Sequence, residues 1–306
     1  MRLAVTALLL GLLATQIDWE LAVRRVRDGD TAWLVAAIAA VFTGLVVGAV
    51  RWRALLRSAA VPATDTEVLR GYFIGAFANN FLPTGFGGDA VRALVVAPRG
   101  PMLARAASTV IVDRLTALAC LLALGWLVLP FDPGAVPAEL VAGLAVCTAA
   151  ALAGAVLLLL TVTSHRVRRR VPDRLRGVLG EMWAPLRTLA GDRPLIARVT
   201  ALGLAYQALI LLSVWCAARS IELELPFTLI AVAVPQVLVL TLVPVSVAGF
   251  GVREGGFAVL LGTAGVSATD ATLLSLTTVA VMAVASLPGA VAIVAGGGRR
   301  AGYSDR

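Results

Sequence analysis

The 306-residue chain is 59% apolar and only 14% charged, whereas an ordinary globular domain is roughly 45–50% apolar and about 25% charged. Its formal net charge is +8, and all 26 of its lysine and arginine positions are arginine. This composition excludes a water-soluble fold and predicts a polytopic, all-α integral membrane protein. The arginines lie mostly between apolar runs, as membrane proteins keep them, so we expect no nucleic-acid binding.

Spanning a bilayer as a helix takes about 20 mostly apolar residues. The predicted full spans, in chain order, are residues 3–17, 31–50, 104–129, 138–162, 195–221 and 271–295. The first run is short and could be read as a signal peptide. The site near Ala14 and Thr15 lacks the small-x-small cleavage pattern, so we expect an uncleaved helix.

Arginine positions predict the orientation, because cytoplasmic loops of membrane proteins are enriched in basic residues. The loop 164–194 carries eight arginines and is predicted to be cytoplasmic, as are the arginine clusters at 51–57, 99–105 and 299–300. The loop 130–139 has no basic residue and is predicted to lie outside. Arginines 24, 25 and 27 do not fit this pattern. We therefore expect a multi-pass plasma-membrane protein with both termini in the cytoplasm.

Two further apolar stretches, 72–97 and 226–266, are interrupted by prolines and clustered glycines, and the first also by two asparagines. The orientation requires each stretch to enter the membrane and return to the side it came from. The predicted fold is six full spans plus two opposed re-entrant hairpins. Such irregular backbone is tolerated at membrane depth where it is buried or lines a wet cavity, and transporters build sites in this way. We expect one domain over 1–306, with 164–194 as a basic loop within it.

The two irregular stretches share a short motif, which indicates an internal repeat. The first reads PTGFGGDAVR over 83–92 and the second PVSVAGFGVRE over 244–254. Glycines allow sharp turns and leave backbone N–H groups exposed, and a helix that starts after such a turn favours an anion. An arginine adds a planar fork suited to phosphate or carboxylate. The alternative is a pair of interfacial turns whose arginines reach the headgroups.

We expect Pro83–Asp89 and Pro244–Glu254 to be non-helical turns near the midplane. Asp113 and Arg114, about ten residues from the cytoplasmic end of their span, are predicted to line the same cavity; an interfacial ion pair is the alternative. Amides between helices can instead serve as structural hydrogen-bonding groups. The predicted substrate-binding residues are Asn79, Asn80, Asp89, Arg92, Asp113, Arg114, Arg253 and Glu254. The three arginines are expected to converge, with the three acids holding them in place.

The chain has three cysteines, each inside an apolar run, and one histidine, His165. They form no metal-ligand or disulfide pattern, and a zinc site or a Cys-His nucleophile pair is not supported. We expect no metal, no cofactor and no catalytic residue.

These motifs together resemble the lysylphosphatidylglycerol synthase transmembrane-region family, also called the flippase-like or UPF0104 family. The residues that carry the resemblance are Asn79 through Pro83, Gly88-Asp89 with Arg92, Asp113-Arg114, Pro244 through Glu254, and Arg51-Trp52-x-x-Leu55-Leu56. One departure is Gly88-Asp89, where the family pattern has Gly-Glu. Larger members add a soluble aminoacyl-transferase domain, and we expect no synthase activity here.

The resemblance implies that the protein moves a lipid or a lipid-linked group between leaflets. Because the arginines suit a phosphate, we expect a flippase or transporter of an anionic phospholipid or a polyprenyl-phosphate-linked lipid. An intramembrane lipid-modifying transferase and an accessory subunit of a membrane glycosyltransferase are the alternatives. The expected partner is a lipid with an anionic headgroup; a homo-oligomer or a membrane-enzyme partner is left open.

Overall fold

The computed structural model describes residue 15 and residues 17–81, 87–163, 191–242 and 249–301. Every regular element within these ranges is helical. The helices are α2 (Trp19–Arg27), α3 (Thr31–Ser58), α4 (Asp65–Phe81), α5 (Gly87–Val96), α6 (Pro101–Val128), α7 (Ala138–Thr163), α10 (Arg193–Ser220), α11 (Phe227–Leu242), α12 (Val252–Gly262), α13 (Ala268–Ala285) and α14 (Leu287–Ala301), with 3-10 turns η1 (Leu129–Phe131) and η2 (Pro133–Ala135).

The expected all-α membrane architecture is confirmed. Five helical segments are long and apolar enough to cross a membrane: Thr31–Ser58, Pro101–Phe131, Ala138–Leu157, Arg193–Ser220 and Ala268–Ala295. They correspond to the last five of the six predicted spans. The first predicted span, 3–17, lies almost entirely outside the described residues.

Local sequence signals fix where several helices begin. Asp30 and Asp192 cap α3 and α10, each accepting a backbone N–H with its carboxylate. Thr64 and Glu67 form a capping box before α4, in which the Thr64 N–H donates to Glu67 Oε2 at 2.7 Å and the Glu67 N–H donates to Thr64 Oγ1 at 3.2 Å. These bonds satisfy N–H groups that have no partner within the helix.

The last predicted span, 271–295, is broken at Ser286 into α13 and α14. Pro288 lacks an N–H and its ring disfavours helical geometry in the residue before it, which accounts for a joint at this position. The Ser286 side chain donates to the Ala283 carbonyl at 2.9 Å and accepts from the Asn80 amide at 2.9 Å. The Ala283 carbonyl, one turn before the joint, therefore has the Ser286 hydroxyl as a hydrogen-bond donor.

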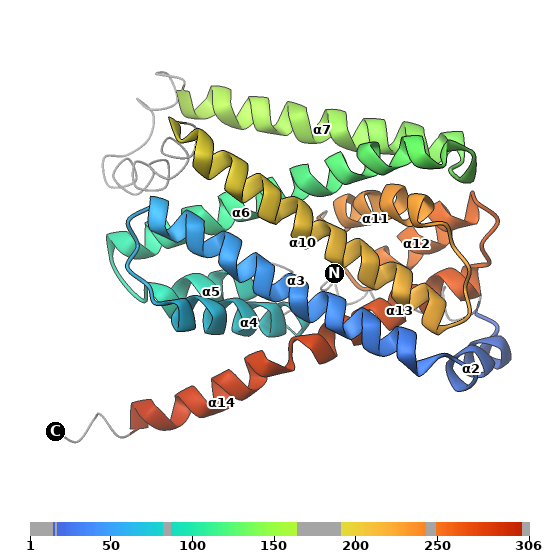
Figure 1. The fold of residues 1–306 in the computed structure, drawn as a ribbon, viewed down its shortest axis with the longest axis horizontal. Coiled ribbons are helices and arrows are strands. Elements are labelled where there is room, and N and C mark those ends of the chain that lie inside the picture. Colours follow the sequence, from blue (N-terminus) through green and yellow to red (C-terminus); the bar gives the residue numbers. More distant parts are fainter. Residues whose placement is uncertain (1–14, 16, 82–86, 164–190, 243–248, 302–306) are drawn as a thin grey trace.

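The long helices run side by side, and α3 and α10 form the most extensive pair (Figure 1). They are antiparallel. The Asp30 N–H at the start of α3 donates to the Ser220 carbonyl at the end of α10, and the rings of Trp33 and Trp215 meet edge to face at 5.3 Å. Helix α6 packs against both, and α7 lies at the periphery against α6 and α11. The α3–α6–α10 group is thus the scaffold for the rest of the molecule.

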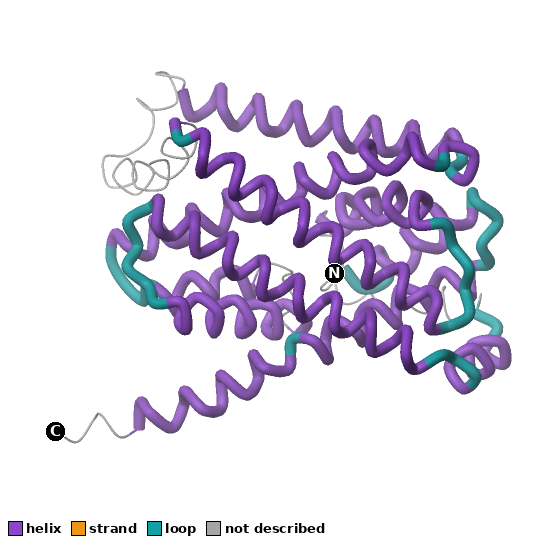
Figure 2. The backbone as a smooth tube through the Cα atoms, viewed as in Figure 1, coloured by secondary structure: helices purple, strands orange, loops and turns teal. Residues whose placement is uncertain are grey.

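Two pairs of shorter helices flank this scaffold (Figure 2). We call α4 and α5 hairpin 1, and α11 and α12 hairpin 2; the helices of each pair pack against each other. Hairpin 1 also contacts α3, α6 and α14, and hairpin 2 contacts α6, α7, α10 and α13.

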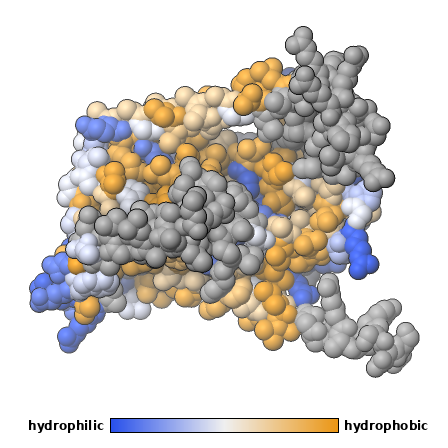
Figure 3. All heavy atoms as spheres, turned by 180° about the vertical axis from the view of Figure 1, so that it is seen from behind, coloured by the Kyte–Doolittle hydropathy of each residue, from blue (hydrophilic) through white to orange (hydrophobic). Residues whose placement is uncertain are grey.

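The surface between the two ends of the molecule is largely apolar. Among the described residues visible in Figure 3, hydrophobic side chains make up most of the middle of the face, and most hydrophilic ones lie toward its two ends. Exposed leucines and valines on α7, such as Leu152 at 63% and Val146 at 68%, belong to this surface. An apolar belt of this kind is the surface that lipid tails cover.

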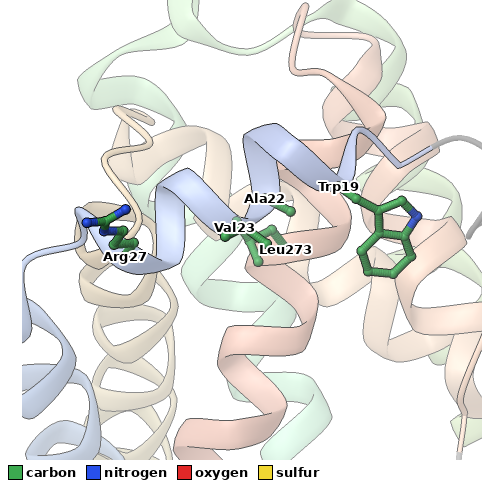
Figure 4. A pocket seen from close by; sticks show the side chains of 5 residues that line it. All are labelled: Trp19, Ala22, Val23, Arg27 and Leu273. Carbon is green, nitrogen blue, oxygen red and sulfur yellow. The ribbon is translucent and has the colours of Figure 1, made fainter.

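The short helix α2 carries the three arginines that did not fit the orientation, and one of them, Arg25, is paired. Arg25 donates to the Glu222 carbonyl at 2.8 Å and lies 3.5 Å from Asp270. A cavity of about 380 Å³ adjoins α2, and its lining is Trp19, Ala22, Val23, Arg27 and Leu273 (Figure 4). No predicted site residue lines this cavity.

Candidate functional site

A chain of alternating charges links α3, α5 and α6 in the interior. The Arg51 guanidinium binds the Asp113 carboxylate through Nε at 2.8 Å and Nη2 at 2.7 Å. Arg92 binds the other Asp113 oxygen through Nη2 at 3.0 Å, and its Nε lies 3.1 Å from Asp89 Oδ1. Asp89 Oδ2 accepts from Arg114 Nε at 2.8 Å. We call these five residues the charge chain.

The two inner arginines are fully enclosed. The Arg92 guanidinium lies over two neighbouring rings, those of Trp52 and Tyr72, 4.9 and 5.0 Å from their centroids. Both distances are within the range of cation–π attraction. The Arg51 guanidinium lies 5.4 Å from the Tyr206 ring. These two side chains have acids on one side and aromatic faces on another, so they are held in one orientation.

A glycine in α10 makes room for Arg51. A methyl group at Gly203 would lie 3.2 Å from Arg51 Nη1 and 2.7 Å from Cys120 Sγ. Trp52 adds a bond across the scaffold, since its ring N–H donates to Thr109 Oγ1 on α6 at 2.9 Å. The scaffold helices are therefore shaped around the inner end of the charge chain.

Arg114 is the exposed end of the chain. Its side chain is 46% exposed, whereas those of Arg51 and Arg92 are 1% and 4% exposed. Arg114 lies at the middle of the 28-residue helix α6, between the exposed side chains of Ile111 and Leu115. The sequence placed Asp113 and Arg114 about ten residues from the end of their span. Because α6 begins at Pro101, they lie deeper, about 18–20 Å along the helix axis.

Asp113 and Arg114 do not pair with each other. Successive residues on a helix point in different directions, and here Asp113 faces the interior while Arg114 faces outward. Asp113 neutralises Arg51 and Arg92 instead, and Arg114 pairs with Asp89 of hairpin 1. Each of these two neighbours is therefore ion-paired with a residue from another helix.

The two asparagines of the first motif bind other parts of the protein. Asn79 Oδ1 accepts from the Gly88 N–H at 2.8 Å, which ties the end of α4 to the start of α5. Asn80 binds Ser286 at the joint between α13 and α14. Both amides therefore form structural hydrogen bonds within the fold, which was the alternative to their predicted role in substrate binding.

The glycines of hairpin 1 allow a backbone contact. A methyl group on Gly88 would lie 1.9 Å from the Gly75 carbonyl oxygen, and one on Gly75 would lie 2.8 Å from the Gly88 carbonyl oxygen. The two helices touch here through their main chains, as small residues permit in membrane helices. This contact sets the position of Asp89, the next residue.

The expected turns are shorter than predicted. Residues 82–86 and 243–248 lie outside the described residues, but α5 begins at Gly87 and α12 at Val252. Gly249 and Gly251 have φ angles of 79° and 83°, a region that favours glycine. Asp89 and Glu254 therefore lie in the first turn of a helix, where the helix dipole stabilises an anion.

Glu254 does not hold Arg253 through an ion pair. Its carboxylate accepts from the Gly251 N–H at 2.6 Å and from the Ser275 hydroxyl at 3.3 Å, and it is 1% exposed. In the described part of the chain, the Arg253 side chain has no ion pair or hydrogen bond. The structure brings Asp89, Arg92, Asp113 and Arg114 together, but it does not join Arg253 and Glu254 to them. No group of three or more His, Cys, Asp or Glu residues within the described ranges could hold a metal ion.

The family comparison identifies the chain. The model of the lysylphosphatidylglycerol synthase TM region matches residues 1–289. The chain belongs to this family.

A curated relative of this lysylphosphatidylglycerol synthase transmembrane-region protein is the UPF0104 membrane protein PH1989 of Pyrococcus horikoshii. The two are 29% identical over 99 residues, which is 31% of this chain and 30% of the relative. The chain thus matches less than a third of that relative's length. No solved structure matches.

Within this family member, sequence reasoning missed the inner end of the charge chain. Arg51 was assigned to a cytoplasmic segment after a span ending at residue 50, but α3 continues to Ser58 and Arg51 is buried. Its neighbour Trp52 and the aromatic residues Tyr72 and Tyr206 were not predicted at all. The sequence signal that could have indicated Arg51 and Trp52 as site residues was the Arg51-Trp52 element, which is one of the motifs that carry the family resemblance.

The Gly75–Gly88 contact gives a first prediction for this family member. Replacing Gly88 with alanine forces the helices of hairpin 1 apart, because the new methyl group would overlap a backbone oxygen. We expect a loss of roughly 1–3 kcal/mol, typical of overpacking. A thermal melt of the purified protein in detergent measures it.

Gly255→Ala is the matched control, since a methyl group on this α12 glycine meets nothing within 4 Å. It should melt like the wild type. Equal melting of the Gly88→Ala and Gly255→Ala variants would contradict the close contact in hairpin 1.

Proposed function

We propose that this protein is a lipid flippase, which moves an anionic phospholipid or a polyprenyl-phosphate-linked lipid between leaflets. The observation that carries the proposal is the exposed Arg114 guanidinium midway along α6, joined through Asp89 to a buried chain of charges. An arginine at the centre of a membrane helix costs about 2.5–3.5 kcal/mol on insertion scales. Such residues face a polar path and mark the route of a substrate or ion.

We propose that the charged side chains of the charge chain act directly on the lipid headgroup as it crosses the membrane. A charged headgroup crosses hydrocarbon slowly because it loses its hydration. A counter-charged, wet groove lowers that cost, while the acyl or prenyl tails remain in lipid. Arg114 of α6 would face this groove, Asp89 of hairpin 1 would hold it there, and the buried Arg92 and Asp113 would support this pair from the interior. Arg253 at the start of α12 remains the proposed headgroup contact from hairpin 2.

We also propose that the chain has six full spans and that hairpins 1 and 2 are re-entrant from opposite sides. The helix arrangement supports this. The outer ends of hairpin 1 lie at the end of the molecule where α3 ends and α6 begins, and those of hairpin 2 lie where α10 ends and α13 begins (Figure 1). On this proposal the arginine-rich end is cytoplasmic, and both termini lie on that side of the plasma membrane.

Cysteine labelling tests this orientation. In a background with the three native cysteines replaced by alanine, Gly134→Cys should react with a membrane-impermeant maleimide in intact cells, because residue 134 is exposed in the turn before α7. Thr66→Cys, exposed at the start of α4, should react only after permeabilisation. The reverse pattern would invert the proposed orientation.

Flipping is tested by reconstitution into liposomes that carry fluorescent phosphatidylglycerol or a short polyprenyl phosphate in both leaflets. Dithionite quenches the outer leaflet, so a flippase takes the quenched fraction from about half to nearly all. Liposomes with a helical membrane protein of unrelated sequence are the control. Quenching that stays at half for every anionic lipid would contradict the proposal. A metal-dependent chemical change of the lipid would instead favour the transferase alternative.

A further inference from the structure

The charge chain contains an odd number of charges. Its three arginines and two aspartates leave one positive charge uncompensated. In the described part of the structure, no further acid pairs with any of these arginines. The site therefore carries a surplus of one elementary charge.

Of the three arginines in the charge chain, Arg114 is the one at which a ligand can reach that surplus, because Arg51 and Arg92 are buried. Asp113 lies between the two enclosed arginines, and Asp89 joins Arg92 to Arg114. Asp89 holds Arg114 by Nε, which fixes the plane of the guanidinium. The Nη1 and Nη2 groups of Arg114 donate no hydrogen bond to the described residues. Two parallel N–H donors at a half-exposed position match two oxygens of one phosphate.

We infer that Arg114 binds a headgroup phosphate through its two Nη groups, and that this site prefers a phosphodiester with one negative charge over a phosphomonoester or pyrophosphate. The inference rests on the proposed function and names its substrate class. One negative charge neutralises the surplus. A second negative charge has no cation to meet within the charge chain, which Arg253 does not join, and an unpaired charge is costly in a low-dielectric site.

Equilibrium binding tests this preference without transport. Dioctanoyl phosphatidylglycerol and dioctanoyl phosphatidic acid are titrated against the purified protein in detergent at pH 5 and pH 8, by microscale thermophoresis. Phosphatidylglycerol keeps one charge at both values. A phosphomonoester has a second pKa near 6, so phosphatidic acid has about one charge at pH 5 and about two at pH 8. We expect similar affinities at pH 5 and about tenfold weaker phosphatidic acid binding at pH 8. Phosphatidic acid that binds equally or more tightly at pH 8 would overturn the inference.

Substitutions in the charge chain test whether it is responsible for the preference for a singly charged phosphodiester. Arg114→Lys keeps the charge but loses the fork, so phosphatidylglycerol binding should weaken while the pH 8 preference persists. Asp89→Asn raises the surplus to two charges and should remove the preference. Arg219→Lys is the control, because Arg219 pairs with Glu224 outside the charge chain, and it should bind like the wild type. Wild-type affinity in Arg114→Lys would overturn the assignment to Arg114, even if Asp89→Asn fails to fold.

Measuring binding and transport separately distinguishes the proposed flippase activity from the proposed preference for a phosphodiester. A preserved preference for the diester in a protein that flips no lipid would remove the proposed transport and leave the binding site. Flipping of diester and pyrophosphate lipids at equal rates, with equal affinities at pH 8, would overturn the inference and leave the flippase.

Discussion

Replacing Arg114 with alanine is expected to abolish flipping while the protein stays folded. The side chain is half exposed, and Asp89 keeps Arg92 as a partner when Arg114 is removed, so the interior charges remain balanced. Without the guanidinium, the headgroup must cross without a counter-charge. The cost of an uncompensated charge on insertion scales, about 2.5–3.5 kcal/mol, corresponds to a flipping rate roughly a hundredfold lower.

The measurement is the initial rate of dithionite-accessible flipping in proteoliposomes, with a thermal melt of the same preparation. Arg114→Lys should recover only part of the rate, because lysine offers a point charge instead of a planar fork. Arg219→Ala, which removes a partly exposed arginine outside the charge chain, should flip at the wild-type rate. If the Arg114→Ala variant flips lipid at the wild-type rate, Arg114 is not needed for transport and its role is structural.

Replacing Asp113 with alanine is expected to have the opposite effect, a loss of fold. Asp113 is 2% exposed and neutralises both Arg51 and Arg92, which are themselves buried. Removing it leaves two buried guanidinium groups without their shared partner. Breaking a buried ion pair in this way costs about 3–5 kcal/mol. The expected result is a strongly lowered melting temperature or no folded protein in detergent.

The matched control is Asp65→Ala. Asp65 also pairs with an α3 arginine, Arg53, at 2.8 Å, but its side chain is 81% exposed. Exposed pairs contribute about 0–1 kcal/mol, so this variant should melt close to the wild type. If Asp113→Ala were as stable as Asp65→Ala, the charge chain would not be the structural centre of the scaffold.

The sequence predicted the helical membrane fold because its signal is local. A run of about 20 apolar residues is visible without knowledge of the rest of the chain, and five such runs are helices of the expected kind. The end of α3 was misplaced because Arg51 interrupts the apolar run. Its compensation comes from Asp113, 62 residues away, and a pairing at that separation cannot be read from a hydropathy pattern.

The site was predicted in part for the same reason. Asp89, Arg92, Asp113 and Arg114 were selected because charges inside apolar stretches are costly, and the structure brings them together. Which acid meets which arginine depends on the helix faces and on the approach of hairpin 1, both of which are tertiary properties. The amides of Asn79 and Asn80 looked like ligands from their surroundings, but each has a partner within the fold.

The joint at Ser286 gives the final pair of helices a property that a single span lacks. Helices α13 and α14 have 18 and 15 residues, or about 27 and 22 Å, and they meet at one residue. A continuous helix that is too long for its bilayer must tilt as a whole. A jointed one can change its inner angle while α14 stays against α4, where Gly289 lies close to the Phe73 carbonyl. The joint at Ser286 therefore gives this span a place where a change of inter-helix angle can absorb hydrophobic mismatch.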